Sequence, residues 1–102
     1  MQSSSEFLED FINKNNLKED IIFLISKFKE YLEFYKINYD ISLDIFRDYF
    51  NKNWSILRLN IKLKDVQDYV EFYLFNHLRE VSKTILSEDK RKKVIIYMSK
   101  DG

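Results

Sequence analysis

Apolar residues recur at intervals of three and four positions in several stretches of the chain, the spacing of one face of an α-helix. This spacing predicts two short helices over residues 6–14 and 43–52, and two longer amphipathic helices over residues 27–37 and 65–86. The two short stretches share one pattern, formed by Phe7, Leu8, Phe11 and Ile12 in the first and by Ile45, Phe46, Tyr49 and Phe50 in the second.

Between the helices lies a stretch in which apolar and polar residues alternate, which is the period of a half-buried strand. Its apolar positions are Leu57, Leu59, Ile61 and Leu63, and lysine, arginine and asparagine stand between them. Residues 21–25 and 94–98 are also rich in residues that favour strands. The three segments together predict a small sheet and therefore an α+β fold.

An all-α fold, built as a pair of helical hairpins, is the alternative. Leu59, Leu63 and Val66 also stand at helical spacing, and Asn16 followed by Glu19 resembles the capping box that begins a helix. Under this alternative, segments 20–26 and 56–63 belong to the long helices that follow them.

The chain resembles itself when it is shifted by 38 positions. When residues 7–38 are aligned with residues 45–76, nine of the 32 pairs are identical. One block of identical pairs is Asn-Lys-Asn at 13–15 and 51–53, and the other contains Tyr, Glu, Phe, Tyr and Asn, ending at Asn38 and Asn76. Repeats of this length are typical of supersecondary units that stack on one another. We therefore expect one domain over residues 1–102, with two pseudo-symmetric helix–(strand)–helix copies and a C-terminal extension over residues 87–102.

The composition is that of a globular protein, with 45% apolar and 33% charged residues. The 17 basic and 17 acidic residues balance, so the chain lacks the overall field of a nucleic-acid or membrane-surface binder, and a homodimer is compatible with it. The longest apolar run, residues 21–25, is too short to cross a bilayer. The N-terminus lacks the features of a secretory signal, so we expect a cytoplasmic protein.

Several catalytic chemistries are excluded by residues that the chain lacks. It has no cysteine and its only glycine is Gly102, so a thiol nucleophile, a disulfide and a glycine-rich phosphate loop are impossible. The single histidine, His77, has no nucleophile motif around it and aligns with Tyr39, which favours a packing role. Glu33 and Glu71 recur between the copies, but a solvated helix face or a polar contact at the seam explains them better than an acid–base pair. We expect no enzymatic activity, no cofactor and no metal.

The two aromatic blocks are the best candidates for a binding surface. If the copies meet about a two-fold axis, the two blocks face each other across the seam. Tyrosine and phenylalanine suit partner recognition because they offer a large contact area. The natural guest is an extended or helical peptide, which the edge strands of a sheet would also capture. The alternative is that the blocks are simply core. We predict a peptide-binding groove formed by Tyr31, Phe34, Tyr35, Tyr69, Phe72 and Tyr73.

Weak DNA or RNA binding is the alternative function. Cationic side chains neutralise phosphates and an aromatic ring stacks on bases. Acidic residues adjoin the basic run of this chain and its overall charge is zero, so nucleic acid is the second choice. The candidate residues are Lys90, Arg91, Lys92 and Lys93, together with Trp54 and Arg58.

In its length, its lack of alanine and cysteine and its two-copy pattern, the chain resembles the small proteins of viruses that infect hot-spring archaea, such as the Acidianus filamentous viruses. The resemblance rests on the general character of the whole chain and not on a motif, so it implies no particular site residues. It implies a viral protein of the host cytoplasm or of the virion, with an unassigned role.

Overall fold

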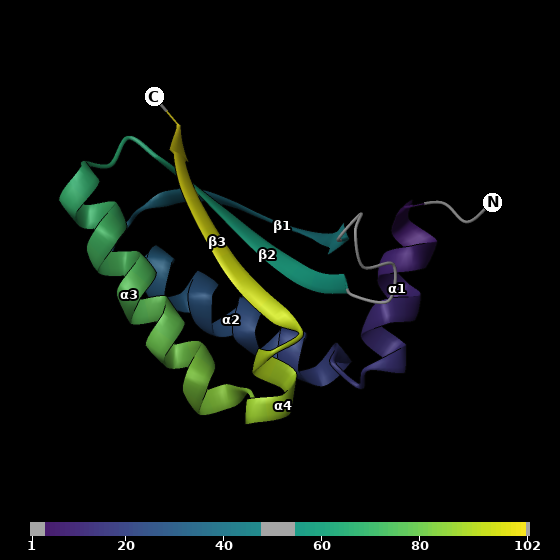
Figure 1. Cartoon of the computed structure of the whole chain (residues 1–102). Helices are drawn as coiled ribbons and strands as arrows, with labels where there is room; N and C mark the ends of the chain where they lie inside the picture. Colours follow the sequence, from purple (N-terminus) through teal and green to yellow (C-terminus); the bar gives the residue numbers. More distant parts are fainter. Residues whose placement is uncertain (1–3, 48–54, 102) are drawn as a thin grey trace.

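The computed structural model describes residues 4–47 and 55–101, which form a three-stranded sheet with helices packed against it (Figure 1). In chain order the elements are α1 (Ser4–Lys14), α2 (Lys18–Phe34), β1 (Asn38–Arg47), β2 (Ser55–Lys64), α3 (Asp68–Ile85), α4 (Glu88–Arg91) and β3 (Val94–Asp101). The strand order is β1-β2-β3, with β1 antiparallel and β3 parallel to β2. The parallel pair requires a crossover connection, which α3 and α4 supply. The prediction of an α+β fold is confirmed.

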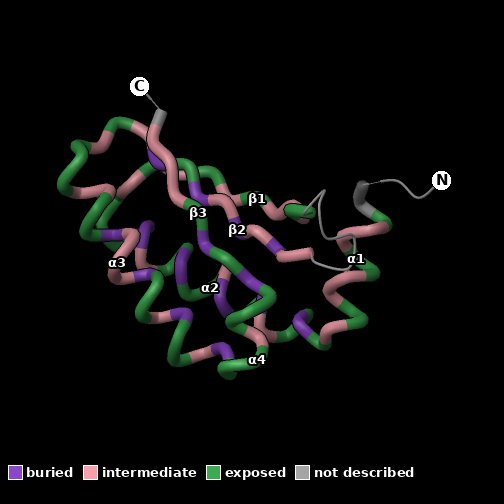
Figure 2. Tube along the Cα trace, viewed as in Figure 1, coloured by how far each residue is buried: buried purple, intermediate pink, exposed green. Residues whose placement is uncertain are grey.

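The central strand, β2, supplies the middle of the core. Leu57, Leu59, Ile61 and Leu63 are wholly buried, whereas the residues between them reach the other face of the sheet. Because successive side chains of a strand point to opposite faces, this pattern shows which face of the sheet covers the core. Figure 2 shows the buried residues on β2 and β3 and on the turns of α2 and α3 beneath them. The strands predicted over residues 57–63 and 94–98 are confirmed as β2 and β3.

Helix α2 occupies the segment 21–25, where a strand was expected. Its apolar residues form one continuous stripe at helical spacing, and a strand would have divided them between two faces. The strand prediction is wrong because the helical stripe extends well beyond the short apolar run. Residues 20–26 lie in a helix, as the all-α alternative placed them, but no side chain caps α2, whose N-cap is Leu17, so the capping box of that alternative does not form. The buried stripe is Leu17, Ile21, Leu24, Phe28 and Leu32.

Strand β1 occupies part of the segment 43–52, where a helix was expected. Its residues Tyr39, Ile41, Leu43 and Ile45 are paired with the buried residues of β2, so they continue the apolar face of the sheet. As a strand, β1 packs these side chains against the core beside β2, and this tertiary packing outweighs the helical spacing of a few apolar positions. The helix prediction is wrong for residues 43–47, and residues 48–52 lie outside the described residues. The helices predicted over 6–14, 27–37 and 65–86 correspond to α1, the second half of α2 and α3.

The two segments of the expected repeat fold differently. Residues 7–38 form most of α1, all of α2 and the first residue of β1, whereas the described part of 45–76 forms the end of β1, β2 and half of α3. The aligned segments 21–25 and 59–63 are helix and strand respectively. The structure therefore does not have the expected two-repeat arrangement. The two aromatic blocks are the exception, because both begin on helices that lie beside each other (Figure 1).

Residues 87–102, which were expected as an extension, contain α4 and β3. The Ser87 hydroxyl accepts a hydrogen bond from the backbone N–H of Lys90 at 3.4 Å and so caps α4. Val94 and Ile96 of β3 are buried with the core residues of β2. This segment therefore completes the sheet.

Candidate functional site

A groove of about 750 Å³ lies where the second half of α2 meets the first half of α3. The two helices run in opposite directions along the sheet (Figure 1), so the end of one lies near the start of the other. None of the lining residues is an aspartate, glutamate, lysine or arginine. The lining is Tyr31, Tyr35, Ile37, Tyr69, Val70, Phe72, Tyr73, Leu74 and Asn76.

Four of the five aromatic side chains that line this groove are exposed. Tyr35 is 54% exposed, Tyr69 70%, Phe72 73% and Tyr73 64%. Each helical residue is turned by about 100° from the one before, so when Leu74 faces the core its neighbours Phe72 and Tyr73 point outward or sideways. Rings of this size, exposed together at one place, form the kind of apolar patch that often marks an interaction site.

The structure brings all six residues that were predicted to bind a partner to this region. Five of them, Tyr31, Tyr35, Tyr69, Phe72 and Tyr73, line the groove itself. The sixth, Phe34, is 77% exposed and lines a neighbouring hollow of about 430 Å³, which shares Tyr31 with the groove. The rings of Phe34 and Tyr35 meet edge to face, with their centroids 5.1 Å apart. The alternative that the aromatic blocks are core residues does not fit those of the six that are exposed.

The groove also contains residues that the sequence reasoning missed. Leu74, only 3% exposed, forms its floor, and Val70 lies one helical turn before it. The Asn76 side-chain amide donates a hydrogen bond to the carbonyl of Phe72 at 2.8 Å, so this polar group is engaged with its own helix. The four-residue spacing of Val70 and Leu74 was a usable signal for the floor. Ile37, in the loop after α2, gave no such signal.

Tyr31 lies at the centre of the aromatic cluster. Its ring stacks on the imidazole of His77 with a centroid distance of 4.3 Å, and the ring of Tyr35 lies at 4.9 Å. Burial, followed by hydrogen bonding and charge interactions with Tyr35 and Tyr73, raises the pKa of Tyr31 to about 12. The phenol therefore stays protonated at neutral pH and can donate a hydrogen bond. His77 lies in this stack, as expected for a packing role.

The recurring glutamates lie on the surface of the helices. Glu33 is exposed and accepts a hydrogen bond from the Tyr39 hydroxyl at 2.7 Å. Burial, followed by this hydrogen bond, raises the pKa of Tyr39. Glu71 is half-buried in the first turn of α3. Hydrogen bonding to a tyrosine at the surface fits the interpretation of a solvated helix face.

The basic residues of the nucleic-acid alternative are partly engaged with other side chains. Lys90 forms an ion pair with Asp20 at 2.5 Å, and Lys93 donates a hydrogen bond to the Asn15 side chain at 2.7 Å. Arg58 donates two hydrogen bonds to the Asp44 carboxylate, at 2.9 and 2.6 Å. Hydrogen bonding to Arg58 lowers the pKa of Asp44. Arg91 and Lys92 are exposed, and Trp54 lies outside the described residues.

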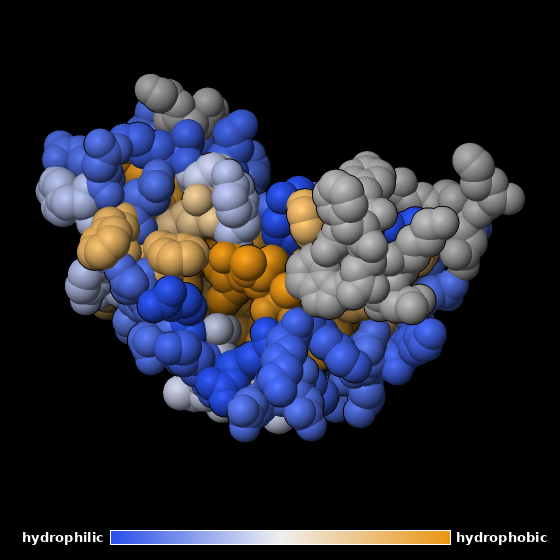
Figure 3. All heavy atoms as spheres, in the orientation of Figure 1, coloured by the Kyte–Doolittle hydropathy of each residue, from blue (hydrophilic) through white to orange (hydrophobic). Residues whose placement is uncertain are grey.

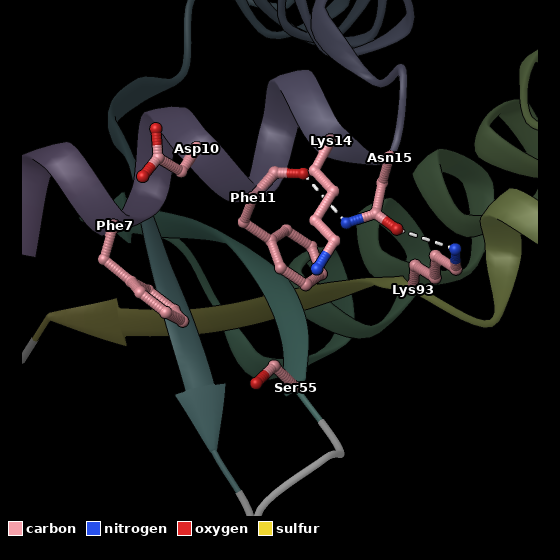
Figure 4. A pocket seen from close by; sticks show the side chains of 7 residues that line it. All are labelled: Phe7, Asp10, Phe11, Lys14, Asn15, Ser55 and Lys93. Carbon is pink, nitrogen blue, oxygen red and sulfur yellow. Dashed lines mark hydrogen bonds between the residues drawn. The ribbon is translucent and has the colours of Figure 1, made fainter.

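A second hollow, of about 460 Å³, lies between α1 and the first residues of β2 (Figure 4). Phe7 and Phe11 project from α1 toward Ser55 at the start of β2. At its far end the Asn15 amide donates a hydrogen bond to the carbonyl of Phe11 at 2.8 Å, and its oxygen accepts one from Lys93. These bonds tie the end of α1 to the start of β3, so the side chains of Asn15 and Lys93 have a structural role.

Within residues 4–47 and 55–101, no three histidine, aspartate or glutamate side chains gather closely enough to hold a metal ion. No helix in the same ranges has both the length and the apolar character needed to cross a membrane. The chain matches no protein-family model, no curated protein and no solved structure. The α2/α3 groove is therefore identified by its own geometry.

Proposed function

We propose that this protein is a non-enzymatic protein-interaction module, which binds a peptide or a segment of a partner protein in the groove between α2 and α3. The observation that carries the proposal is the exposure of four aromatic side chains, 54–73% each, around a groove without charged lining. Burying such rings against a partner would remove a large apolar area from water, which is the main driving force of association.

The chemistry of the groove favours a guest with apolar side chains. Leu74 and Val70 supply an aliphatic floor, and the tyrosines combine an apolar ring with a hydroxyl that can bond a backbone group of the guest. The volume of about 750 Å³ is in the usual range for sites that hold one ligand or a few side chains. An amphipathic helix or an extended segment with two or three large apolar residues meets these requirements.

The repeated aromatic blocks fit this proposal. Tyr31 and Tyr35 come from the first block, and Tyr69, Phe72 and Tyr73 from the second, at an offset of 38 positions. The two blocks form opposite walls of one groove, although the segments around them fold differently. In this proposal the shared residues reflect one binding requirement that applies to both walls.

The nucleic-acid alternative has weaker support. A phosphate-binding surface needs cations that are free to contact phosphates. Lys90 already pairs with Asp20, and Arg58 with Asp44, so binding a phosphate there would first require separating an ion pair. The exposed Arg91 and Lys92 alone are a small patch on a chain of zero net charge.

A displayed library of random peptides tests the proposal. Peptides are selected on the intact protein and then measured against Phe34→Ala/Phe72→Ala, and against Phe23→Ala as a matched control. Phe23 is also an exposed phenylalanine of α2, at 49%, but it lines neither the groove nor the neighbouring hollow that contains Phe34. We expect selected peptides to be rich in apolar residues, to lose at least tenfold in affinity for the double variant and to keep their affinity for the control.

Chemical-shift mapping with a selected peptide locates the binding surface independently. Shifts that centre on Tyr35, Tyr69 and Tyr73 would agree with the proposal. Shifts that centre on Arg91 and Lys92, or equal affinity for the double variant and the control, would refute it.

A further inference from the structure

Strand β3 ends the sheet on one side, and half of its backbone groups point away from β2. The N–H of Leu57 donates to the carbonyl of Lys93 at 2.8 Å, and Leu57 lies opposite Val94. In a parallel pair, alternate residues direct both polar groups to the same neighbour. Ile95 and Tyr97 therefore bond to β2, whereas Ile96 and Met98 direct their N–H and C=O groups outward, where no described strand pairs with them.

The first five residues of β3 lack the features that normally prevent an edge strand from pairing. Edge strands are usually protected by charged side chains, proline or bulges. The opposite edge strand, β1, has Asp40 and Asp44 along its length, and both form ion pairs with β2. In contrast, residues 94–98 contain no charge, and the whole chain contains no proline. Figure 3 shows apolar side chains gathered over β3 beside α3.

We propose that a second copy of this chain pairs with β3, antiparallel and about a two-fold axis perpendicular to the sheet. This operation keeps the two faces of the sheet in place, so the three strands of each copy join into one continuous sheet. The register centred on Ile96 places Ile96 opposite its own copy, with their outward N–H and C=O groups exchanged. It also places Val94 opposite Met98 on the core face and Ile95 opposite Tyr97 on the other face.

This register makes the strand complementary to itself, which favours a second copy over an unrelated peptide. Ile95 and Tyr97 are 47% and 52% exposed, and each would be covered by the other residue from the partner copy. Pairs of an aromatic and a β-branched side chain are among the favourable cross-strand pairs. The net charge of zero means that two copies do not repel each other at long range.

The area available indicates a reversible dimer. This register pairs residues 94–98 of the two copies, which extend over about 17 Å at about 3.4 Å each, and a contact strip about 10–15 Å wide covers roughly 170–250 Å² per copy. A standard interface buries about 800 Å² per partner. We therefore expect a dimer that dissociates on dilution.

Sedimentation equilibrium and residue-resolved amide exchange test this arrangement together, over about 1–500 µM to bracket weak and moderate dimers. We expect the average mass to rise from 12.5 kDa toward twice that value. The amides of Ile96 and Met98 should become protected as the dimer forms, whereas those of Ile95 and Tyr97 should be protected throughout. A monomer at the highest concentration, or a dimer in which the Ile96 and Met98 amides gain no protection, would overturn the proposal.

Substitutions distinguish this interface from the α2/α3 groove. Ile95→Lys should weaken dimerisation at least tenfold, because it places a charge against the apolar partner strand. Met98→Pro should do the same, since it removes an outward N–H while leaving the bonds to β2 in place. Phe23→Lys makes the same charge change on α2 and should have no effect. Dimerisation that survives Ile95→Lys and Met98→Pro but is lost in Tyr35→Ala/Tyr73→Ala would assign the dimer to the groove and refute the inference.

Discussion

The double substitution Phe34→Ala/Phe72→Ala separates a binding surface from a core, because the two interpretations predict different stabilities. Phe34 is 77% exposed and Phe72 73%, so about a quarter of each side chain is buried. Complete removal of a buried phenylalanine costs about 3–5 kcal/mol, which scales to about 1 kcal/mol at each position. Alanine favours the helix more than phenylalanine by roughly 0.5 kcal/mol per site, which offsets part of the loss. We expect a net destabilisation of about 1 kcal/mol.

The matched comparison is Leu32→Ala/Leu78→Ala, which removes apolar residues from the same two helices. Leu32 is 0% exposed and Leu78 1%, so each substitution should cost about 2–5 kcal/mol. Their sum approaches the whole free energy of unfolding of a domain of this size, about 5–15 kcal/mol. We therefore expect this comparison variant to be largely unfolded or to melt at a much lower temperature.

Urea unfolding followed by far-ultraviolet circular dichroism measures both variants on one scale. The midpoint of the aromatic variant should shift little and its slope should match that of the parent chain, since the surface exposed on unfolding is nearly unchanged. A loss of more than about 3 kcal/mol in the aromatic variant would mean that the two rings are core residues. That result would refute the reasoning that assigns them to a binding surface.

Three further predictions concern stability. Arg58 lowers the pKa of Asp44, so this pair stabilises the fold at pH values above the carboxyl's unfolded pKa of about 3.9, and the stabilisation is lost as the pH falls through the lower folded pKa. Asp44→Asn should cost at most about 1 kcal/mol at pH 7, and it should flatten the decline of stability at acid pH when urea unfolding is measured against pH. Because the pKa of Tyr31 is raised to about 12, stability should decline as the pH rises from about 10 toward 12, and Tyr31→Phe should remove a tyrosine that ionises near pH 12 from an ultraviolet titration. Leu59→Ala, in the wholly buried centre of β2, should cost about 2–5 kcal/mol in the same urea assay.

The elements that could be predicted from the sequence are those in which local pattern and tertiary packing agree. Leu57 to Leu63 alternate without interruption, and the strand that they form is buried on one face only. The apolar positions of α3 repeat at helical spacing over five turns, so one helix of that length was the simplest solution. In these segments the spacing of apolar residues in the sequence matches the spacing of residues on one face of the strand or helix that forms.

The elements that were missed are those in which a short apolar run fits both periods. Residues 21–25 are all apolar, so only the more distant Leu17, Phe28 and Leu32 reveal the helical stripe. In β1, Ile41, Leu43 and Ile45 alternate with polar residues, but the resemblance to the first short helix suggested a repeat and favoured the wrong period. Pairing with β2 decides the structure of this segment, and such pairing is not visible locally.

The candidate site was predictable although the symmetry that suggested it is absent. Its residues were found by the recurrence of aromatic side chains, which does not depend on how the intervening segments fold. Proximity of the two blocks requires only that both lie on helices packed against the same sheet, which the structure provides. The floor residue Leu74 aligns with Lys36 of the first block, so the recurrence between the blocks gave no signal for it.

The groove and the outer side of β3 lie on opposite flanks of α3, and this separation has a consequence for assembly. Tyr73 and His77 face Tyr31 of α2, whereas Asp68 reaches Lys100 of β3 on the other flank. Pairing through β3 therefore leaves the groove accessible, so a dimer would present two grooves related by its two-fold axis. A partner with two suitable segments would bind the second groove at a high effective concentration, provided that its linker spans the distance.

Ile95→Lys should then weaken the binding of a two-segment partner while leaving the binding of a single-segment peptide unaffected. Equal loss for both ligands would mean that the two surfaces are not independent.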